Sequence, residues 1–210
     1  MIKILIADDH PLFREGLKKT LSEEADLNVC CEAQDSNELS QKLRVHQHGV
    51  VIVDINMPGR SGLEVLKEIR TEYPKLPVLV LSMYPEDRFA VRAIRDGAAG
   101  YLTKETVPNQ LVKAIREVTN GKKYITPSVA EKLALEIEAP TDKPLHESLS
   151  NREYQLLCSI ASGKSMKVIA EQLCISVNTV KSYRARLLQK INLKTNVELT
   201  QYALRNKLVD

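Results

Sequence analysis

The stretch Val50-Val-Ile-Val-Asp54-Ile-Asn-Met-Pro58-Gly59 decides the fold of the first half of this chain. Its first four residues, Val50–Val53, form a short apolar run, which is typical of a strand buried on both faces of a parallel sheet. The run ends directly in a carboxylate, Asp54, and then in a loop. That position matters because ligands of open α/β sheets bind outside the carboxyl ends of the strands.

Apolar runs and amphipathic stretches alternate on both sides of this stretch. Ile2–Ala7 and Val78–Leu81 are further buried-strand candidates, and weaker strands are expected near Val29–Ala33 and Ala99–Leu102. Helical spacing of apolar residues predicts helices over Pro11–Leu21, Gly62–Tyr73 and Pro108–Asn120. The first of these is expected to place on one side Leu12, Gly16, Leu17 and Leu21. The alternation predicts an α/β domain, a doubly wound five-stranded parallel (βα)5 sheet over residues 1–121.

The rest of the chain predicts a linker and an all-α domain. Thr126-Pro127 is a good helix start, and the helix is expected to reach Ile137, before Ala139-Pro-Thr-Asp-Lys-Pro144 breaks it. Residues 122–147 are therefore predicted to be a linker with one helix. Residues 148–210 open with the capping box Ser150-Asn-Arg-Glu153 and predict four short helices, the third over Val177–Ile191.

Charge divides the chain unevenly. Of the 210 residues, the segment 148–210 carries 10 Lys and Arg against 4 Asp and Glu, whereas residues 1–147 carry 20 against 23. This asymmetry indicates an anionic partner for the second domain, with nucleic acid the first candidate. No apolar run approaches the roughly 18 to 20 residues of a membrane span, and Asp8-Asp9 comes too early for a signal peptide, so a cytoplasmic protein without a membrane partner is expected.

The four cysteines predict no site. Cys30, Cys31, Cys158 and Cys174 fit neither a CxxC metal pattern nor the disulfide framework of a secreted protein. We expect them to act as small buried hydrophobic residues.

Polar residues at the predicted strand ends indicate phosphate chemistry. Asp8 and Asp9 follow the first strand, Asp54 the third and Ser82 the fourth, and Lys104 comes after the fifth. Converging carboxylates repel one another, and a hard cation with oxygen ligands, most naturally Mg²⁺, relieves that repulsion. A carboxylate can attack phosphorus while a lysine and a hydroxyl stabilise the charge on the phosphoryl oxygens.

Four segments resemble the receiver domain of two-component response regulators: Asp8-Asp9-His10, Asp54-Ile-Asn-Met-Pro-Gly59, Leu81-Ser82 and Gly100-Tyr-Leu-Thr-Lys104. The resemblance implies that a sensor histidine kinase phosphorylates Asp54. It also implies that Asp9 and Asp54 bind Mg²⁺ directly, that Asp8 acts mainly through water, and that the backbone carbonyl of Asn56 completes the ligands.

The same resemblance assigns a switch. Ser82 hydrogen-bonds the phosphoryl group, and Tyr101 is similar to the aromatic residue that changes rotamer when Ser82 moves. One departure is Met83, since a small residue is usual there. Its bulk predicts restricted access of water and small phosphodonors, which affects the rates of phosphorylation and dephosphorylation.

Several of these residues also have plainer interpretations. Paired acids such as Asp8 and Asp9 are more often solvated than metal-binding, although their place at a strand end favours the metal site. His10, at a helix start, is interpreted as a polar surface group, and Tyr101 has ordinary strand core as its alternative. Gly59 and Gly62 form no phosphate-cradling motif, and turn geometry explains them.

A helix, a tight turn and a basic helix in the second domain indicate DNA binding. From Gln172 through Val197 there is no acidic residue, while five Lys or Arg occur. The segment resembles the LuxR-type helix-turn-helix of the NarL/FixJ family through Leu149-Ser-Asn-Arg-Glu153, Gly163-Lys-Ser165, Ile169-Ala170 and Ile175-Ser-Val-Asn-Thr-Val-Lys181.

The family position implies contacts with double-stranded promoter DNA. Lys181, Ser182 and Ala185 are expected to face the major groove. The implied DNA-binding set is Asn178, Thr179, Lys181, Ser182, Arg184, Ala185, Arg186 and Lys190, of which Thr179, Arg184, Arg186 and Lys190 are expected at or near phosphates. Val168 and Tyr183 depart from common family residues and weaken any transfer of sequence preference. Family precedent also implies a homodimer, or separated domains, in the active form.

Two other classes of function compete with this hypothesis. A Mg²⁺-dependent phosphatase also uses a nucleophilic Asp, but it normally has an acid–base Asp where Asn56 stands, and it needs no basic helical tail. The second competing class is an interaction module, whose receiver is never phosphorylated and whose tail binds protein. The predicted function is a response regulator and transcription factor, not an enzyme.

Overall fold

The computed structural model describes residues 1–45, 47–138 and 144–209. The chain divides into two units, Met1–Glu138 and Ala139–Asp210. Most of the predicted helix-breaking stretch 139–144 lies outside the described residues.

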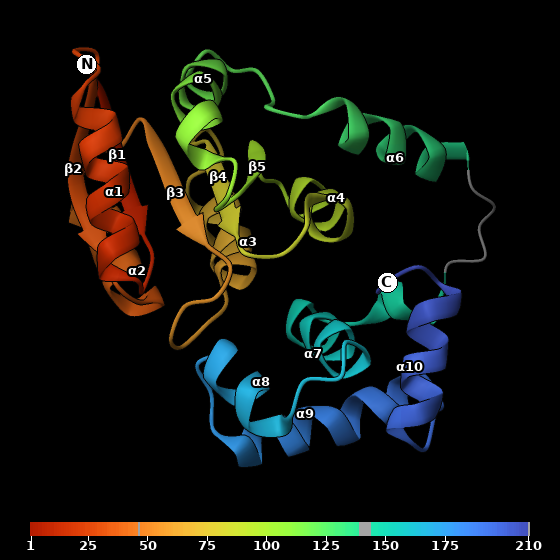
Figure 1. The fold of residues 1–210 in the computed structure, drawn as a ribbon. Coiled ribbons are helices and arrows are strands. Elements are labelled where there is room, and N and C mark those ends of the chain that lie inside the picture. Colours follow the sequence, from red (N-terminus) through yellow and green to blue (C-terminus); the bar gives the residue numbers. More distant parts are fainter. Residues whose placement is uncertain (46, 139–143, 210) are drawn as a thin grey trace. The chain divides into compact units, whose positions relative to one another are not determined.

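The first unit is built on five parallel strands in the order β2-β1-β3-β4-β5 (Figure 1). They are β1 (Ile2–Ala7), β2 (Leu27–Ala33), β3 (Val50–Asp54), β4 (Val78–Ser82) and β5 (Gly100–Thr103). All five residues of β3 are buried, as expected for a central strand covered on both faces. The predicted doubly wound sheet is confirmed, and its strand order reverses between β1 and β3, where a binding crevice is expected.

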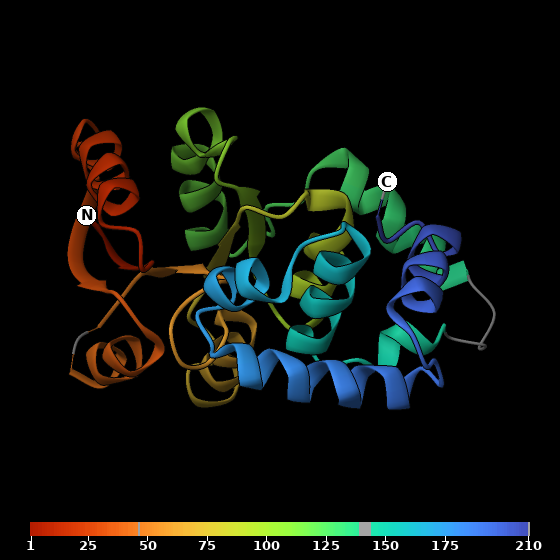
Figure 2. The same cartoon turned by 60° about the horizontal axis from the view of Figure 1, so that its bottom comes forward.

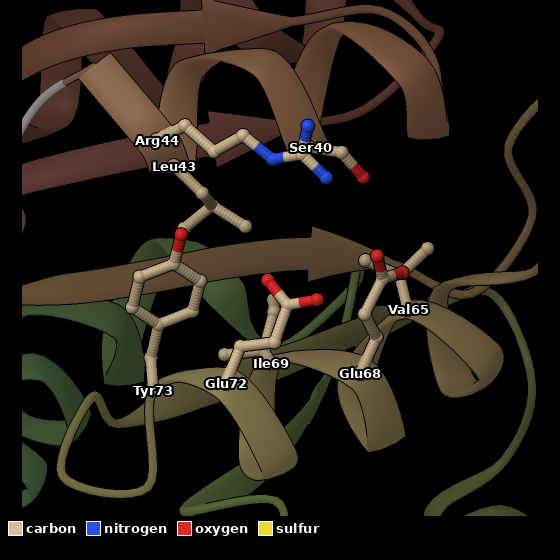
Figure 3. A pocket seen from close by; sticks show the side chains of 8 residues that line it. All are labelled: Ser40, Leu43, Arg44, Val65, Glu68, Ile69, Glu72 and Tyr73. Atoms are coloured by element: carbon tan, nitrogen blue, oxygen red, sulfur yellow. The ribbon is translucent and has the colours of Figure 1, made fainter.

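Helices cover both faces of the sheet. Helices α1 (Pro11–Ser22) and α5 (Val107–Thr119) lie on one side, and α2 (Ser36–Val45) and α3 (Gly62–Glu72) on the other (Figure 2). Helix α4 (Glu86–Arg95) packs beside β5. Between α2 and α3 lies a pocket whose lining includes none of the acidic residues at the strand ends (Figure 3).

One detail of α1 differs from the prediction. Leu17 and Leu21 are buried as expected, but the side chain of Leu12 is 89% exposed and Gly16 is also exposed. The buried stripe follows the four-residue spacing from the partly buried Phe13 through Leu17 to Leu21. Leu12 was therefore wrongly placed on the inner side, because it lies about 100° around the helix from that stripe.

The segment after α5 packs back onto the first unit. Tyr124 forms a parallel bridge with Gly100, and its hydroxyl donates to Gln110 Oε1 at 2.9 Å. Helix α6 (Pro127–Glu138) then contacts α4, and Val129 is buried. The helix starts at the predicted Pro127.

The second unit contains the four predicted α-helices, preceded by the short 3-10 helix η1 (Leu145–Ser148). They are α7 (Asn151–Ala161), α8 (Met166–Gln172), α9 (Val177–Lys190) and α10 (Asn196–Arg205). Hydroxyl caps begin each helix, with complete capping boxes at Ser150–Glu153 and Thr195–Glu198. Within this unit, α8 and α10 lie at opposite ends of α9, and α7 contacts all three (Figures 1 and 2).

The cysteines differ from the expectation that all are buried. Cys158 is buried, but Cys31 and Cys174 are only partly covered and Cys30 is exposed. Cys30 lies on the edge strand β2, where one side of the strand has no neighbour. The expectation was wrong for Cys30, because an edge strand does not bury alternate residues as a central strand does.

Candidate phosphoacceptor site and DNA-binding helix

Three carboxylates meet where β1 and β3 end. Asp8 and Asp54 are buried to 0% and 1% exposure, and Asp9 is partly buried. Their ligand atoms, together with Nδ1 of His10, all lie within 4.8 Å of one another. The cluster forms because parallel strands end at the same edge of the sheet, with Asp8 and Asp9 directly after β1 and Asp54 as the last residue of β3.

The ammonium of Lys104 pairs with two of these carboxylates. Its Nζ lies 2.6 Å from Asp8 Oδ2 and 2.7 Å from Asp54 Oδ2. The backbone N–H of Lys104 donates to the Ser82 carbonyl at 2.8 Å, which anchors the loop after β5 beside β4. The ammonium also lies 4.6 Å from the centre of the Phe13 ring. One buried ammonium thus forms ion pairs with two buried carboxylates.

Burial dominates the electrostatics of Asp54. It raises the pKa of this carboxyl to about 6, with the charge of Asp8 acting in the same direction and that of Lys104 against it. Burial alone would lower the pKa of Lys104, but Asp54 and Asp8 raise it above its usual value. The cluster therefore keeps an excess of negative charge at neutral pH.

His10 contacts the cluster, although the sequence suggested a plain surface group. Its side chain is 61% exposed, but Nδ1 lies 2.8 Å from Asp9 Oδ1 and 3.1 Å from Asp8 Oδ1. The backbone N–H of His10 also donates to Asp8 Oδ1 at 2.8 Å. The position of His10 directly after two acids could have predicted this contact, because the turn into α1 brings the ring back toward Asp8 and Asp9.

The oxygen donors of the cluster fit Mg²⁺. Three carboxylates from two adjacent strand ends offer the hard ligands that this cation prefers. Asn56, whose backbone N–H donates to Asp54 Oδ1 at 3.2 Å, belongs to the same loop. Lys104 pairs with Oδ2 of both Asp8 and Asp54, so a bound cation would share these two carboxylates with the ammonium.

Ser82 ends the neighbouring strand β4, and Tyr101 lies within β5, opposite Val80. The Ser82 hydroxyl accepts from the Tyr84 backbone N–H at 2.9 Å, and the Tyr101 hydroxyl donates to the Tyr84 carbonyl at 2.9 Å. Tyr101 is 3% exposed, and burial raises the pKa of its hydroxyl while a hydrogen bond with Ser82 opposes that rise. Met83, between Ser82 and Tyr84, is 66% exposed. The predicted switch residues are thus linked through the loop after β4.

Gly62 supports the site in a way that turn geometry alone does not explain. Gly59 has a φ of +83°, as a turn glycine does, but Gly62 has no such value. Instead, a Cβ on Gly62 would lie 2.1 Å from the backbone oxygen of Asp54 and 3.0 Å from Cα of Ile55. Glycine is required there because α3 starts against the backbone of the phosphoacceptor candidate.

We therefore expect Gly62→Ala to destabilise the first unit by about 1–3 kcal/mol or more, because the neighbouring backbone must move. Gly16→Ala is the matched control, since a Cβ at Gly16 meets nothing within 4 Å. It should stabilise α1 by about 0.5–1 kcal/mol. Urea unfolding followed by circular dichroism measures both changes, and equal stability of the two variants would contradict the close approach at Gly62.

Helix α9 presents four of the predicted DNA-binding residues on one exposed face. Asn178, Lys181, Ser182 and Ala185 are exposed and have the i, i+3, i+4, i+7 spacing of one helix face. Arg186 is also exposed. The opposite face packs into the unit through the buried residues Val180, Leu187 and Leu188.

Four of the expected DNA-binding residues have side chains with partners within the unit, and one of them is Ser182, whose hydroxyl donates to the Asn178 carbonyl at 3.1 Å. Arg184 Nε donates to Asn196 Oδ1 at 2.6 Å, and Lys190 Nζ donates to Glu153 Oε2 at 2.7 Å. The hydroxyls of Thr179 and Ser176 lie 2.8 Å apart at the start of α9. These contacts compete with phosphate contacts, and those of Arg184 and Lys190 depend on tertiary packing that the sequence does not reveal.

Comparison with known proteins identifies a family for each of the two units. Residues 4–116 match the family model described as the response regulator receiver domain, and residues 147–203 match that of the bacterial regulatory proteins of the LuxR family. The chain belongs to the NarL/FixJ family of response regulators. Members of this family are transcription regulators rather than enzymes, which excludes the phosphatase alternative.

Relatives of this response regulator match over the full length. It is 36% identical to the response regulator GacA of Pseudomonas protegens over 100% of this chain and 99% of that protein. It is 38% identical to the oxygen regulatory protein NreC of Staphylococcus carnosus over 100% of both. RcsB of Salmonella enterica serovar Typhimurium, solved bound to the promoter rprA in the presence of phosphomimetic BeF3⁻, is similar with a TM-score of 0.63, 27% identity and coverage of 96% of this chain and 97% of that one.

In the described part of this response regulator, no helix is both long enough and apolar enough to cross a membrane.

Proposed function

We propose that Asp54 accepts a phosphoryl group from the phosphohistidine of a sensor histidine kinase, and that this modification controls binding of the second unit to promoter DNA. The observation that carries the proposal is the buried Asp54 with Lys104 Nζ 2.7 Å away, at the strand edge that also holds Asp8, Asp9 and Ser82. The family supplies the phosphodonor by analogy with two-component systems.

Each residue has a defined role in this transfer. A carboxylate oxygen of Asp54 attacks phosphorus, the P–N bond of the phosphohistidine breaks, and the donor imidazole keeps the electron pair and takes up a proton. Lys104 moves from its pairing with Asp8 and Asp54 to the phosphoryl oxygens, and the Ser82 hydroxyl donates to another of them. Asp9, Asp54 and the backbone carbonyl of Asn56 would hold Mg²⁺, with Asp8 acting through water. Bound Mg²⁺ supplies charge neutralisation between the acids and the incoming phosphoryl group.

We propose that Ser82 and Tyr101 transmit the effect of phosphorylation at Asp54 to the rest of the chain. When the Ser82 hydroxyl turns toward the phosphoryl group it gives up its contact with the Tyr84 N–H. The Tyr101 side chain, whose hydroxyl donates to the Tyr84 carbonyl, then changes rotamer. We propose that this change favours homodimerisation or release of the second unit, so that two copies of α9 bind paired half-sites of a duplex.

Intact-mass analysis after incubation with acetyl phosphate and Mg²⁺ tests the phosphoacceptor. We expect one phosphoryl adduct on the wild type and none on Asp54→Asn. Met83→Ala should react at least as fast, since Met83 flanks Ser82 and its bulk would only restrict the small donor. Two results would contradict the proposal. One is an adduct on Asp54→Asn, and the other is the absence of an adduct from both the wild type and Met83→Ala.

The salt dependence of DNA binding tests the proposed role of α9. Replacing both Lys181 and Arg186 by Ala should lower the slope of log K against log salt by about 1 to 2, because fewer counterions are released. Arg205→Ala is the control, since Arg205 is exposed on α10 and should leave the slope unchanged. An unchanged slope in the double variant would place the contact surface elsewhere.

A further inference from the structure

Outside the acidic cluster, the described residues bring together a second group of metal-ligating side chains. The ligand atoms of Cys30, Cys31 and His48 all lie within 4.8 Å of one another. Cys30 and Cys31 are on β2, and His48 lies two residues before β3. None of the three takes part in the phosphoryl chemistry described above.

A β-bulge explains how two consecutive cysteines can share one site. In the pairing of β1 with β2, Ile4 lies opposite Val29 but Leu5 lies opposite Cys31, so Cys30 is an extra residue in the register, and its thiol donates to the Ile4 carbonyl at 3.4 Å. Side chains of consecutive residues in a regular strand point to opposite faces. The bulge breaks this alternation at Cys30, and the ligand atoms of the two cysteines come within 4.8 Å of each other beside His48.

The ring of His48 is oriented with one nitrogen toward the thiols. Its Nε2 lies 3.2 Å from the backbone carbonyl of Lys42, in the last turn of α2. A carbonyl only accepts, so Nε2 carries the hydrogen and Nδ1 presents its lone pair, 3.5 Å from Cys30 Sγ. A partner on the other ring nitrogen is the arrangement that orients a metal-binding histidine. The same bond also satisfies a helix-end carbonyl, which is the purely structural explanation of His48.

We propose that Cys30, Cys31 and His48 bind one thiophilic divalent cation, Zn²⁺ by ligand type, with a fourth position open to water. Thiolate and imidazole ligands favour Zn²⁺ over Mg²⁺. Zn–S and Zn–N bonds of about 2.3 and 2.0 Å in a tetrahedral site place the ligand atoms about 3.5 Å apart, close to the distance from Cys30 Sγ to His48 Nδ1. Binding replaces the two thiol protons, which pass to the solvent. The ion joins the edge strand β2 to the segment before β3.

Titration of the reduced full chain with Co²⁺, and with Zn²⁺ in competition, tests this site while excess Mg²⁺ occupies the acidic cluster. We expect one ion per chain, thiolate-to-Co²⁺ charge-transfer absorption, and release of about two protons on Zn²⁺ binding. Cys30→Ser, Cys31→Ser and His48→Gln should each weaken binding by at least about 100-fold, since even a lost outer partner costs 10–100-fold. Cys174→Ser and Asp9→Asn should bind as the wild type does.

Two outcomes would overturn the proposal. One is Zn²⁺ affinity that survives all three ligand replacements, and the other is affinity lost in Asp9→Asn, which would place the ion in the acidic cluster. Circular dichroism of each variant shows that it is folded. As a second readout, Zn²⁺ should raise the unfolding temperature of the wild type but not that of Cys31→Ser.

Discussion

Lys104→Met should lower the free energy of unfolding of the first unit by about 3–5 kcal/mol at pH 7.5 without divalent cations, because it leaves buried carboxylates without their cation. The ammonium lies within 2.7 Å of both Asp8 and Asp54, and these acids are almost completely buried. At pH 5 the loss should be smaller, since protonation of Asp54 removes part of the uncompensated charge. Urea unfolding in the presence of EDTA at both pH values measures the change.

Lys113→Met is the matched control for Lys104→Met. The Lys113 side chain is 72% exposed and lies 4.0 Å from Glu117, so its loss should cost less than about 1 kcal/mol. If Lys104→Met is too unstable to purify, Lys104→Met combined with Asp54→Asn should recover part of the loss, because one of the two orphaned charges is gone. Equal stability of the two lysine variants would contradict the proposed charge balance.

Asp54→Asn should make the metal-free first unit more stable at neutral pH, by at most about 3 kcal/mol, since one pKa unit corresponds to about 1.4 kcal/mol. The pKa of Asp54 is about 6 in the folded protein against 3.8 as the ordinary value. Between these pH values the folded state holds a proton that the unfolded state has lost, so stability from this group falls as pH rises and is lowest above pH 6. Asparagine does not ionise, so the variant does not lose this stability as pH rises. The free energies of unfolding of the two proteins should become equal near pH 4.

Asp26→Asn provides a control of opposite sign. A hydrogen bond from Arg116 holds the pKa of the exposed Asp26 below its ordinary value. Its charged form is favoured in the folded state, so the substitution should lower stability at neutral pH rather than raise it. Unfolding curves from pH 4 to 8 in EDTA separate the two cases, and a destabilised Asp54→Asn at pH 7.5 would contradict the excess of negative charge.

The sequence predicted that the groups of the candidate phosphoacceptor site lie together, because their positions follow directly from strand order. Val50–Val53 is apolar throughout, which marks a central strand, and Asp54 comes immediately after it. Once the strands are parallel, Asp8, Ser82 and Lys104 must lie at the same edge as Asp54. The limits of α2 and α4 were not predicted. Helix α2 buries only three residues, two of them leucines, and α4 is short, with Phe89, Ala90, Val91 and Ala93 as its buried apolar residues, so each helix offers few large apolar side chains from which to predict its limits.

Features that depend on contacts between distant segments escaped prediction. The approach of Gly62 to the Asp54 backbone requires the position of α3 against β3. The cluster of Cys30 and Cys31 requires the shifted register between β1 and β2, because a regular strand would separate the two thiols. Likewise, the ion pair of Lys190 with Glu153 joins helices that are not adjacent in sequence.

The central claim, that phosphorylation of Asp54 controls DNA binding, is tested most directly by the affinity for one duplex before and after phosphorylation. A duplex selected from a random-sequence pool by the phosphorylated chain serves as the probe, at fixed salt. We predict that phosphorylated wild type binds it about 5- to 150-fold more tightly than unphosphorylated wild type, the usual range for coupled sites. Asp54→Asn, treated identically, should bind as weakly as the unphosphorylated chain. Equal affinity of the two wild-type forms, or Asp54→Asn binding like the phosphorylated protein, would contradict the claim.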